Sequence, residues 1–193
     1  MHFPFDFIPP AKLEEGYLQI PANCYFVGTA NKDDSTFTIT DKVYDRAITI
    51  DFDNRNDAFK VTEDVDLINV SYSHLQGLFD KALNNEDNQM TSEDFKKFTT
   101  ITDFIYEKFD ITFGNRILMQ ITNIVPVFIA CGGKKEDALD FLLSRKIIYK
   151  IEGRFEDYIK QGLLDLRNLI VKTYGKGNFR LTIKEIDKLL RKL

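Results

Sequence analysis

The fold class is decided by residues 24–52, which read CYFVGTANKDDSTFTITDKVYDRAITIDF. Residues 24–30 form a short, near-continuous apolar run that ends in a polar loop, which is typical of a strand buried on both faces of a parallel sheet. Residues 47–52 predict a second strand. Between them, residues 40–46 are long enough for two helical turns, with Thr40 or Asp41 as the N-cap. The pattern therefore indicates an α/β unit made of a strand, a polar loop, a short helix and a strand.

The remainder of the chain is predicted to be helical. Residues 53–66 are polar and indicate a linker. Thr91 and Asp94 have the spacing of a capping box, and Pro126 predicts a kink in the helix that Gly132 and Gly133 end. The predicted helices are Leu67 to Leu83, Thr91 to Phe109, Asn115 to Ala130, Glu136 to Lys150, Phe155 to Tyr174 and Thr182 to Leu193.

The sequence thus predicts an α+β fold that is mainly α, with two domains. Residues 1–60 form the α/β part and residues 61–193 a helical domain. Two strands cannot close a doubly wound sheet, because such strands need helices on both faces. Either the helical domain covers them, or the rest of their domain lies outside this chain.

Composition excludes several classes of protein. The 193 residues are 44% hydrophobic and 29% charged with a net charge of −4, as in ordinary soluble proteins without a global drive toward nucleic acid or anionic membrane. The most apolar long run, residues 117–131, is interrupted by polar residues and is shorter than the roughly 20 residues of a membrane span. Cys24 and Cys131 stand in apolar runs, which predicts buried hydrophobes without a disulfide in a reducing cytoplasm.

Two residues of the α/β unit are candidates for chemistry. Asn31 follows the first predicted strand, at the carboxyl edge of the sheet where open α/β folds bind ligands. Its amide can hold an attacking water or a γ-phosphate oxygen without adding charge. Arg46 ends the short helix and can reach a neighbour's nucleotide as an arginine finger, which is worth about 10³ to 10⁵ in rate in phosphoryl transfer.

This stretch resembles the McrB-type branch of the AAA+ ATPases. The resemblance is carried by Gly28-Thr29-Ala30-Asn31, by Asp33, Ser35 and Thr36, and by the run Asp41-Lys42-Val43-Tyr44-Asp45-Arg46-Ala47. It implies that residues 1–60 are the C-terminal part of the AAA+ α/β core. It also implies that Asn31 is the sensor 1 residue and that Arg46 is the inter-subunit arginine. The family usually has two arginines where this chain has Asp45 and Arg46.

A looser resemblance extends into the helices. Phe113-Gly114-Asn115-Arg116 is similar to the start of the family's lid helix, so Arg116 becomes the candidate nucleotide-binding sensor 2 arginine. Residues 147–153 resemble a second lid segment. The resemblance implies a homo-oligomeric ring that uses ATP or GTP with Mg²⁺, and in restriction systems a nuclease subunit and DNA as partners.

The elements that bind nucleotide phosphates and magnesium in this family have no counterpart in the chain. It contains no Gly-x-x-x-x-Gly-Lys-Ser/Thr loop, and no apolar strand ending in paired acids precedes Asn23. We therefore expect no turnover and no bound nucleotide from this chain alone. The alternative is a non-catalytic helical module, descended from such an ATPase and used in assembly.

Each candidate also has an ordinary structural interpretation. Asn31 can cap a turn, Arg46 can be a solvated surface arginine, and Arg116 can simply begin a helix. The acids Asp33, Asp34, Asp51 and Asp53 do not have the spacing of a calcium loop, and neither histidine has a ligand partner nearby, so no metal site is predicted.

Overall fold

The fold is taken from a computed structural model of the whole chain. It describes residues 13–14, 17–18, 20–30, 41–52, 69–112, 114–152, 154 and 157–193. The chain divides into two units, residues 1–37 and residues 38–193. In the first unit, strands β1 (Leu13–Glu14) and β2 (Tyr17–Leu18) pair antiparallel with Leu13 opposite Leu18.

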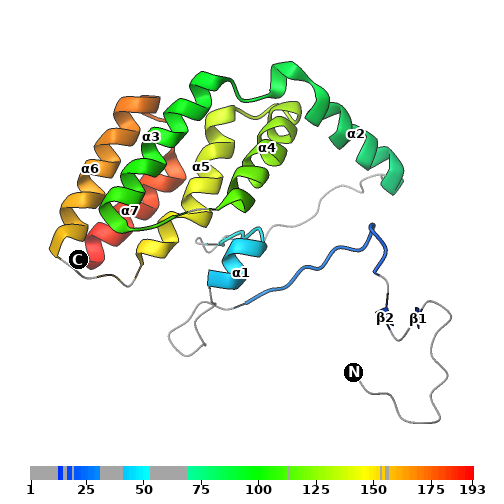
Figure 1. The fold of residues 1–193 in the computed structure, drawn as a ribbon, viewed down its shortest axis with the longest axis horizontal. Coiled ribbons are helices and arrows are strands. Elements are labelled where there is room, and N and C mark those ends of the chain that lie inside the picture. The colour runs from blue at the N-terminus through cyan, green and yellow to red at the C-terminus, as the bar shows by residue number, and fades with distance from the viewer. Residues whose placement is uncertain are drawn as a thin grey trace, which may run out of the picture. The chain divides into compact units, whose positions relative to one another are not determined.

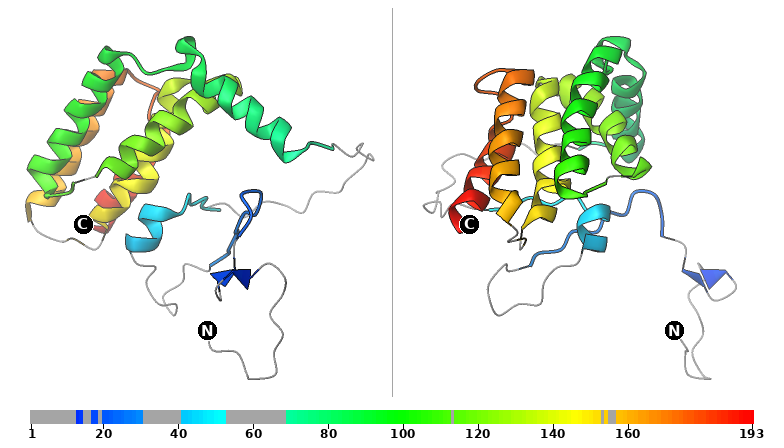
Figure 2. Two further views of the ribbon diagram at one scale, coloured as in Figure 1. Left: turned by 45° about the vertical axis from the view of Figure 1, so that its right-hand side comes forward. Right: turned by 60° about the vertical axis from the view of Figure 1, so that its left-hand side comes forward.

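The second unit is helical. Figures 1 and 2 show α3, α5, α6 and α7 running along one another, with α2 projecting from one end. Its elements are α1 (Asp41–Arg46), α2 (Tyr72–Asn84), the 3₁₀ turn η1 (Glu86–Asn88), α3 (Ser92–Phe109), α4 (Asn115–Ala130), α5 (Lys135–Lys146), the 3₁₀ turn η2 (Ile148–Ile151), α6 (Asp157–Tyr174) and α7 (Arg180–Lys192). The prediction of a mainly α chain is confirmed.

Helix α3 begins with the predicted capping box. The Thr91 hydroxyl accepts a hydrogen bond from the Asp94 amide at 3.2 Å, and the Asp94 carboxylate accepts one from the Thr91 amide at 2.8 Å. These bonds satisfy two backbone donors that no helical carbonyl can reach. Four side chains spaced three or four residues apart are buried along one face of α3: Phe98, Ile101, Ile105 and Phe109.

Helix α4 has the predicted bounds, with Pro126 inside it, and ends before a glycine. Gly132 has φ +85°, a left-handed conformation that favours glycine. A side chain at Gly133 would clash, because a Cβ there would lie 2.3 Å from the Phe128 ring. This turn brings the chain back so that α5 packs along α4.

Helix α5 is the central helix of the bundle. It packs against α4, α7, η2 and α1, and its residues Leu139, Leu142 and Leu143 are at most 1% exposed. It ends at Lys146, four residues before the predicted end, and the chain continues into η2. Its neighbours surround it so completely that two of its charged residues, Asp140 and Lys146, are also buried.

The two predicted strands are not formed. Residues 24–30 and 47–52 belong to no strand, and no described segment pairs with them. A strand requires a hydrogen-bonded neighbour, and neither segment has one in the described part of the chain. Their large apolar side chains are consequently exposed: Val27 by 93%, Ile50 by 70% and Phe52 by 91%.

The prediction of buried cysteines is wrong. Cys24 and Cys131 are both free thiols, and both are exposed. Cys24 lies in the unpaired apolar segment, and Cys131 is the C-cap of α4, so neither faces the core. Within the described ranges, no helix has the length and apolar character that crossing a membrane requires.

Candidate functional site

The candidate site is the place where α1 contacts the end of α5 and the η2 turn. Residues 41–52, here called the α1 arm, comprise α1 and the extended segment after it. Figure 1 shows α1 beneath the C-terminal end of α5, and the two helices are in contact. Helix α1 has only six residues, too few to be stable by itself. Contacts with the bundle must therefore hold it.

The central contact is made by Lys146, the last residue of α5. Its side chain is buried, with 1% of the residue exposed. The ammonium donates hydrogen bonds to the carbonyl oxygen of Tyr44, at 2.5 Å, and to that of Ala47. Carbonyls at a helix C-terminus lack helical partners and carry partial negative charge, so a cation there satisfies both needs.

The environment of Lys146 contains charges of both signs. Burial lowers the pKa of the Lys146 ammonium; the carboxylate of Asp45 opposes this, and the positive charges of Lys150 and Arg116 add to the lowering. Asp45 forms an ion pair with Lys150, with 3.0 Å between Oδ1 and Nζ. The aromatic rings of Tyr44 and Tyr149 are in contact, with 4.4 Å between their centroids and 32° between their planes. The site thus combines a capped helix end, an ion pair and a ring contact.

The extended part of the α1 arm has two different faces. Asp51 forms an ion pair with Arg145, and Thr49 is half-buried. The alternate residues Ile48, Ile50 and Phe52 are 49%, 70% and 91% exposed. This alternation has the period of a strand that has one apolar side uncovered.

The sequence-predicted site residues have different outcomes. Arg46 lies in the last turn of α1 and is exposed. Arg116 is exposed in the first turn of α4, and its positive charge helps to lower the pKa of Lys146. Asn31 lies outside the described residues. The structure therefore brings α1 and Arg116 to the same end of the bundle around Lys146.

Sequence reasoning missed Lys146, Tyr149 and Lys150. A lysine at a helix C-terminus is commonly explained by the dipole of its own helix. The sequence gives no sign that Lys146 instead binds the end of another helix. The available signal was the spacing. Lys146 lies three and four residues after Leu143 and Leu142, on the buried side of α5, and a lysine is rarely buried there without a hydrogen-bond partner.

A second buried charge on α5 mirrors Lys146. The carboxylate of Asp140 accepts hydrogen bonds from the amides of Leu181, at 2.8 Å, and Thr182, at 2.7 Å, in the first turn of α7. Burial raises the pKa of Asp140, although these hydrogen bonds favour its ionised form. Helix α5 therefore places an anion at the N-terminus of one helix and a cation at the C-terminus of another, as helix dipoles favour.

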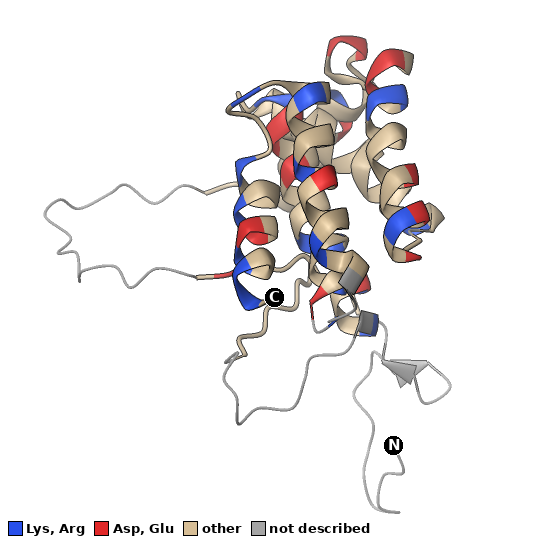
Figure 3. Ribbon diagram, turned by 90° about the vertical axis from the view of Figure 1, so that its left-hand side faces the viewer, with Lys and Arg blue, Asp and Glu red and all other residues tan. Residues whose placement is uncertain are grey.

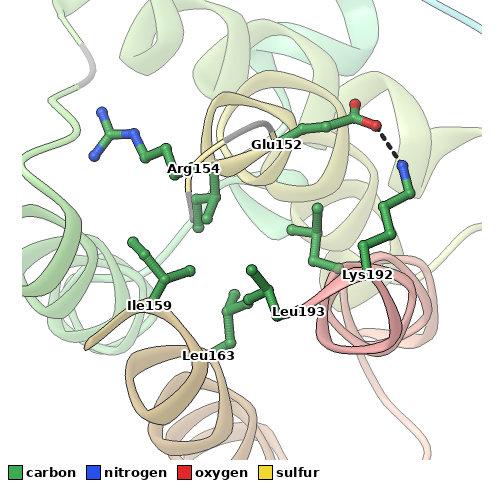
Figure 4. A pocket seen from close by; sticks show the side chains of 8 residues that line it. Glu152, Arg154, Ile159, Leu163, Lys192 and Leu193 are labelled. Carbon is green, nitrogen blue, oxygen red and sulfur yellow. Dashed lines mark hydrogen bonds and ion pairs between the residues drawn. The ribbon is translucent and has the colours of Figure 1, made fainter. Parts of the chain in front are cut away.

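A cavity of about 240 Å³ lies elsewhere in the bundle, between η2, α6 and α7. Figure 4 shows apolar side chains such as Ile159, Leu163 and Leu193 around it, and an ion pair of 2.7 Å between Lys192 and Glu152 at one side. The lining is mostly apolar, and its one lysine is paired. This chemistry suits an apolar group and offers no catalytic constellation.

Charge on the bundle surface is mixed. Figure 3 shows lysine and arginine residues interspersed with acidic residues along the helices on that side. No side chains of His, Cys, Asp or Glu in the described ranges gather in groups of three or more that could hold a metal ion. The chemical features that the α1 arm presents are the exposed guanidinium of Arg46 and a strand-like apolar face.

Comparisons with known proteins identify a family for the helical part. The domain of unknown function DUF8727 matches residues 65–193, which contain every helix from α2 to α7. No curated protein matches the chain, and no solved structure matches it either. Because the family match covers more than half of the chain, this protein belongs to the DUF8727 family.

Proposed function

We propose that this chain is the C-terminal part of a McrB-type AAA+ nucleoside triphosphatase, supplying sensor 1, the arginine finger and the lid. In the complete enzyme, a ring that uses ATP or GTP with Mg²⁺, Asn31 positions water or the γ-phosphate. Arg46 reaches the adjacent subunit's nucleotide, and Arg116 contacts phosphate when the lid closes. A DNA restriction system, with a nuclease subunit and DNA, is the setting that the resemblance implies.

The observation that carries this proposal is the exposure of the two apolar segments. Phe26 and Val27 are 80% and 93% exposed, and Ile50 and Phe52 are 70% and 91% exposed. Apolar side chains of this size in segments of strand composition belong under a covering layer of protein. Exposed apolar edges also invite pairing with further strands. Exposed, unpaired segments of strand composition are what we expect if the remaining strands, with the phosphate loop and the paired acids, come from outside this chain.

The geometry of the α1 arm is consistent with this role. Three residues around Arg46 (Tyr44, Asp45 and Ala47) are tied to the bundle, whereas Arg46 itself is exposed. An arginine finger needs a rigid base and a free guanidinium. Arg116, exposed on the same end of the bundle, has the freedom that a lid arginine needs.

A second candidate is a non-catalytic assembly module built on the helical bundle. One observation favours it: the family match begins at residue 65, so it leaves out the α1 arm. This candidate does not require Arg46 to act on a nucleotide. The two candidates therefore differ in what removal of the Arg46 guanidinium does.

The first experiment is to sequence the genomic DNA upstream of the Met1 codon and to express any longer in-frame product. We expect an in-frame Gly-x-x-x-x-Gly-Lys-Ser/Thr loop and a strand ending in paired acids. In that product, Arg46→Ala should lower ATP or GTP hydrolysis by about 10³-fold or more. Lys42→Ala, which removes another exposed cation from α1, should leave hydrolysis nearly unchanged.

A mixing experiment tests whether Arg46 acts between subunits. Arg46→Ala and Asn31→Ala subunits are each expected to be inactive, because each lacks one part of every site. In mixed rings, some interfaces pair an intact Asn31 with an intact Arg46 from the neighbour, so part of the activity should return. An upstream sequence without the phosphate loop, or equal activity of the Arg46→Ala and Lys42→Ala enzymes, overturns the proposal and leaves the assembly module.

A further inference from the structure

The contacts around Arg46 share one feature: each ties the α1 arm to α5 or η2. Tyr44 and Ala47 give their carbonyl oxygens to Lys146, Asp45 pairs with Lys150, and Asp51 pairs with Arg145. The partners on the bundle side are thus found within residues 145–150, one short segment. A movement of this segment would carry the α1 arm with it.

Lys146 differs from the other partners in its burial. Arg145 and Lys150 keep 13% and 16% of their side chains exposed, and the acids that they bind are 34–40% exposed. Lys146 is 1% exposed and faces neutral carbonyl oxygens. Taking an ammonium out of water is unfavourable unless hydrogen bonds replace its hydration. Its two hydrogen bonds exist only while the end of α1 stays in place, so docking of α1 and burial of Lys146 depend on each other.

We propose that Lys146 is the positioning residue for Arg46, holding the end of α1 on the end of α5 so that the bundle sets where the guanidinium points. The inference rests on the proposed function for the role of Arg46, but not for the docking itself. In the working ring, docking by Lys146 would couple Arg46 to the helical domain of its own subunit. A change in the position of that domain would then move the arginine that reaches the neighbouring subunit.

The docking is tested by hydrogen–deuterium exchange on this chain, without nucleotide. Lys146→Met keeps an unbranched side chain as far as the Cε position and removes the donor. We expect it to raise the exchange rate of the amides of residues 45–47 about tenfold or more. These amides bond within α1, as that of Ala47 does to the Val43 carbonyl at 2.8 Å, and the end of α1 loses its charged donor. Protection of α3, α6 and α7 should be unchanged. The control is Lys160→Met, which removes an exposed lysine of α6.

A milder variant keeps the test valid if Lys146→Met does not fold. Lys146→Gln retains a neutral donor and should give exchange between that of the wild type and that of Lys146→Met. If a folded variant at position 146 leaves exchange in residues 45–47 at the wild-type rate, the docking role of Lys146 is overturned.

The functional arm uses the longer enzyme described under the proposed function. We expect Lys146→Met to lower kcat and to leave KM unchanged. In the Arg46→Ala background it should have no further effect, since both substitutions remove the same guanidinium from its place. Faster exchange in α1 with normal kcat would overturn the positioning role while the ATPase proposal stands. If Arg46→Ala does not lower hydrolysis while Lys146→Met speeds exchange in α1, the ATPase proposal is overturned and the docking by Lys146 stands.

Discussion

The helical bundle and the α1 arm are built on different principles. The bundle is held by a continuous apolar core in which residues such as Ile101, Leu143 and Leu166 are fully buried. The α1 arm contacts it through ion pairs, a lysine cap and one ring pair, while its own large apolar residues point outward. The bundle buries most of its large apolar side chains, whereas the arm leaves most of its own exposed.

The difference indicates what each region needs from its surroundings. Burial of apolar surface stabilises by roughly 25 cal/mol per Å², and a bundle of this kind gains most of its stability from that source. Partly exposed ion pairs contribute about 0–1 kcal/mol each. The bundle can therefore fold as a unit. Polar contacts position the arm on the bundle but add little to the stability of the fold, and they leave a strand-like apolar face for a partner.

The largest expected effect is on the free energy of unfolding, and it distinguishes the helical bundle from the α1 arm. Leu143 is fully buried in α5, so Leu143→Ala should lower the free energy of unfolding by about 2–5 kcal/mol through lost transfer energy and a cavity. Ile50→Ala, at a residue 70% exposed, should change it by less than about 0.5 kcal/mol. Urea denaturation monitored by circular dichroism measures both. Equal losses at the two positions would show that the arm contributes to the core.

An intermediate effect is expected at the cap between α5 and α7. Asp140→Ala removes the acceptor for the amides of Leu181 and Thr182, and Phe179, the N-cap residue of α7, has no side-chain bond to replace it. Loss of a helix cap costs about 0.5–2 kcal/mol. The same denaturation measurement checks this, with Asp165→Ala on the surface of α6 as the control. A loss no greater than that of the control would contradict the capping role.

The same residue predicts a dependence on pH. Because burial raises the pKa of Asp140, the folded protein binds its proton more tightly than the unfolded chain does. This contribution to stability is fully present below the unfolded value of about 3.9 and is lost as the pH rises through the raised pKa. Relative to Asp140→Asn, which does not titrate, the wild type should gain stability as the pH falls through this window. A difference that stays constant with pH would rule out the raised pKa.

The smallest effect on stability, but a visible effect on association, is expected at the apolar face of the arm. Ile50→Ser with Phe52→Ser should leave the free energy of unfolding nearly unchanged, because both side chains are mostly exposed. It should lower self-association of the chain, since an exposed apolar strand face invites contacts between copies. Sedimentation velocity measures this. Met119→Ser, at an exposed residue of α4, is the control, and identical behaviour of both variants would contradict a special role for the arm.

The helices were predictable because their signals are local. The Thr91–Asp94 box begins α3 as predicted, the bounds of α4 are those predicted, and Gly132 takes the left-handed conformation that ends the helix. Caps, glycine turns and a repeat of three to four residues act within a few positions of the chain. In the candidate site, the same local signals predicted α1 and placed Arg46 at its end.

The strands failed for a reason that no local signal contains. Residues 24–30 and 47–52 have strand composition, but strand formation depends on a neighbouring strand, and none pairs with them in the described part of the chain. The helix predicted to reach Lys150 ends at Lys146, where the side chain turns to the end of α1. Both errors concern contacts between segments far apart in the sequence.

The sequence by itself determined where most helices begin and end, that the chain is mainly helical, and that Arg46 and Arg116 stand at helix ends. Those properties follow from hydrogen bonds and packing within single helices. Only the tertiary structure decided that Asp140 and Lys146 are buried and that each satisfies the end of a different helix. The physical reason is that a buried charge must be compensated by groups of opposite polarity. Here those groups are the amides of α7 and the carbonyl oxygens of α1, which are distant in sequence and are brought to Asp140 and Lys146 only by the fold.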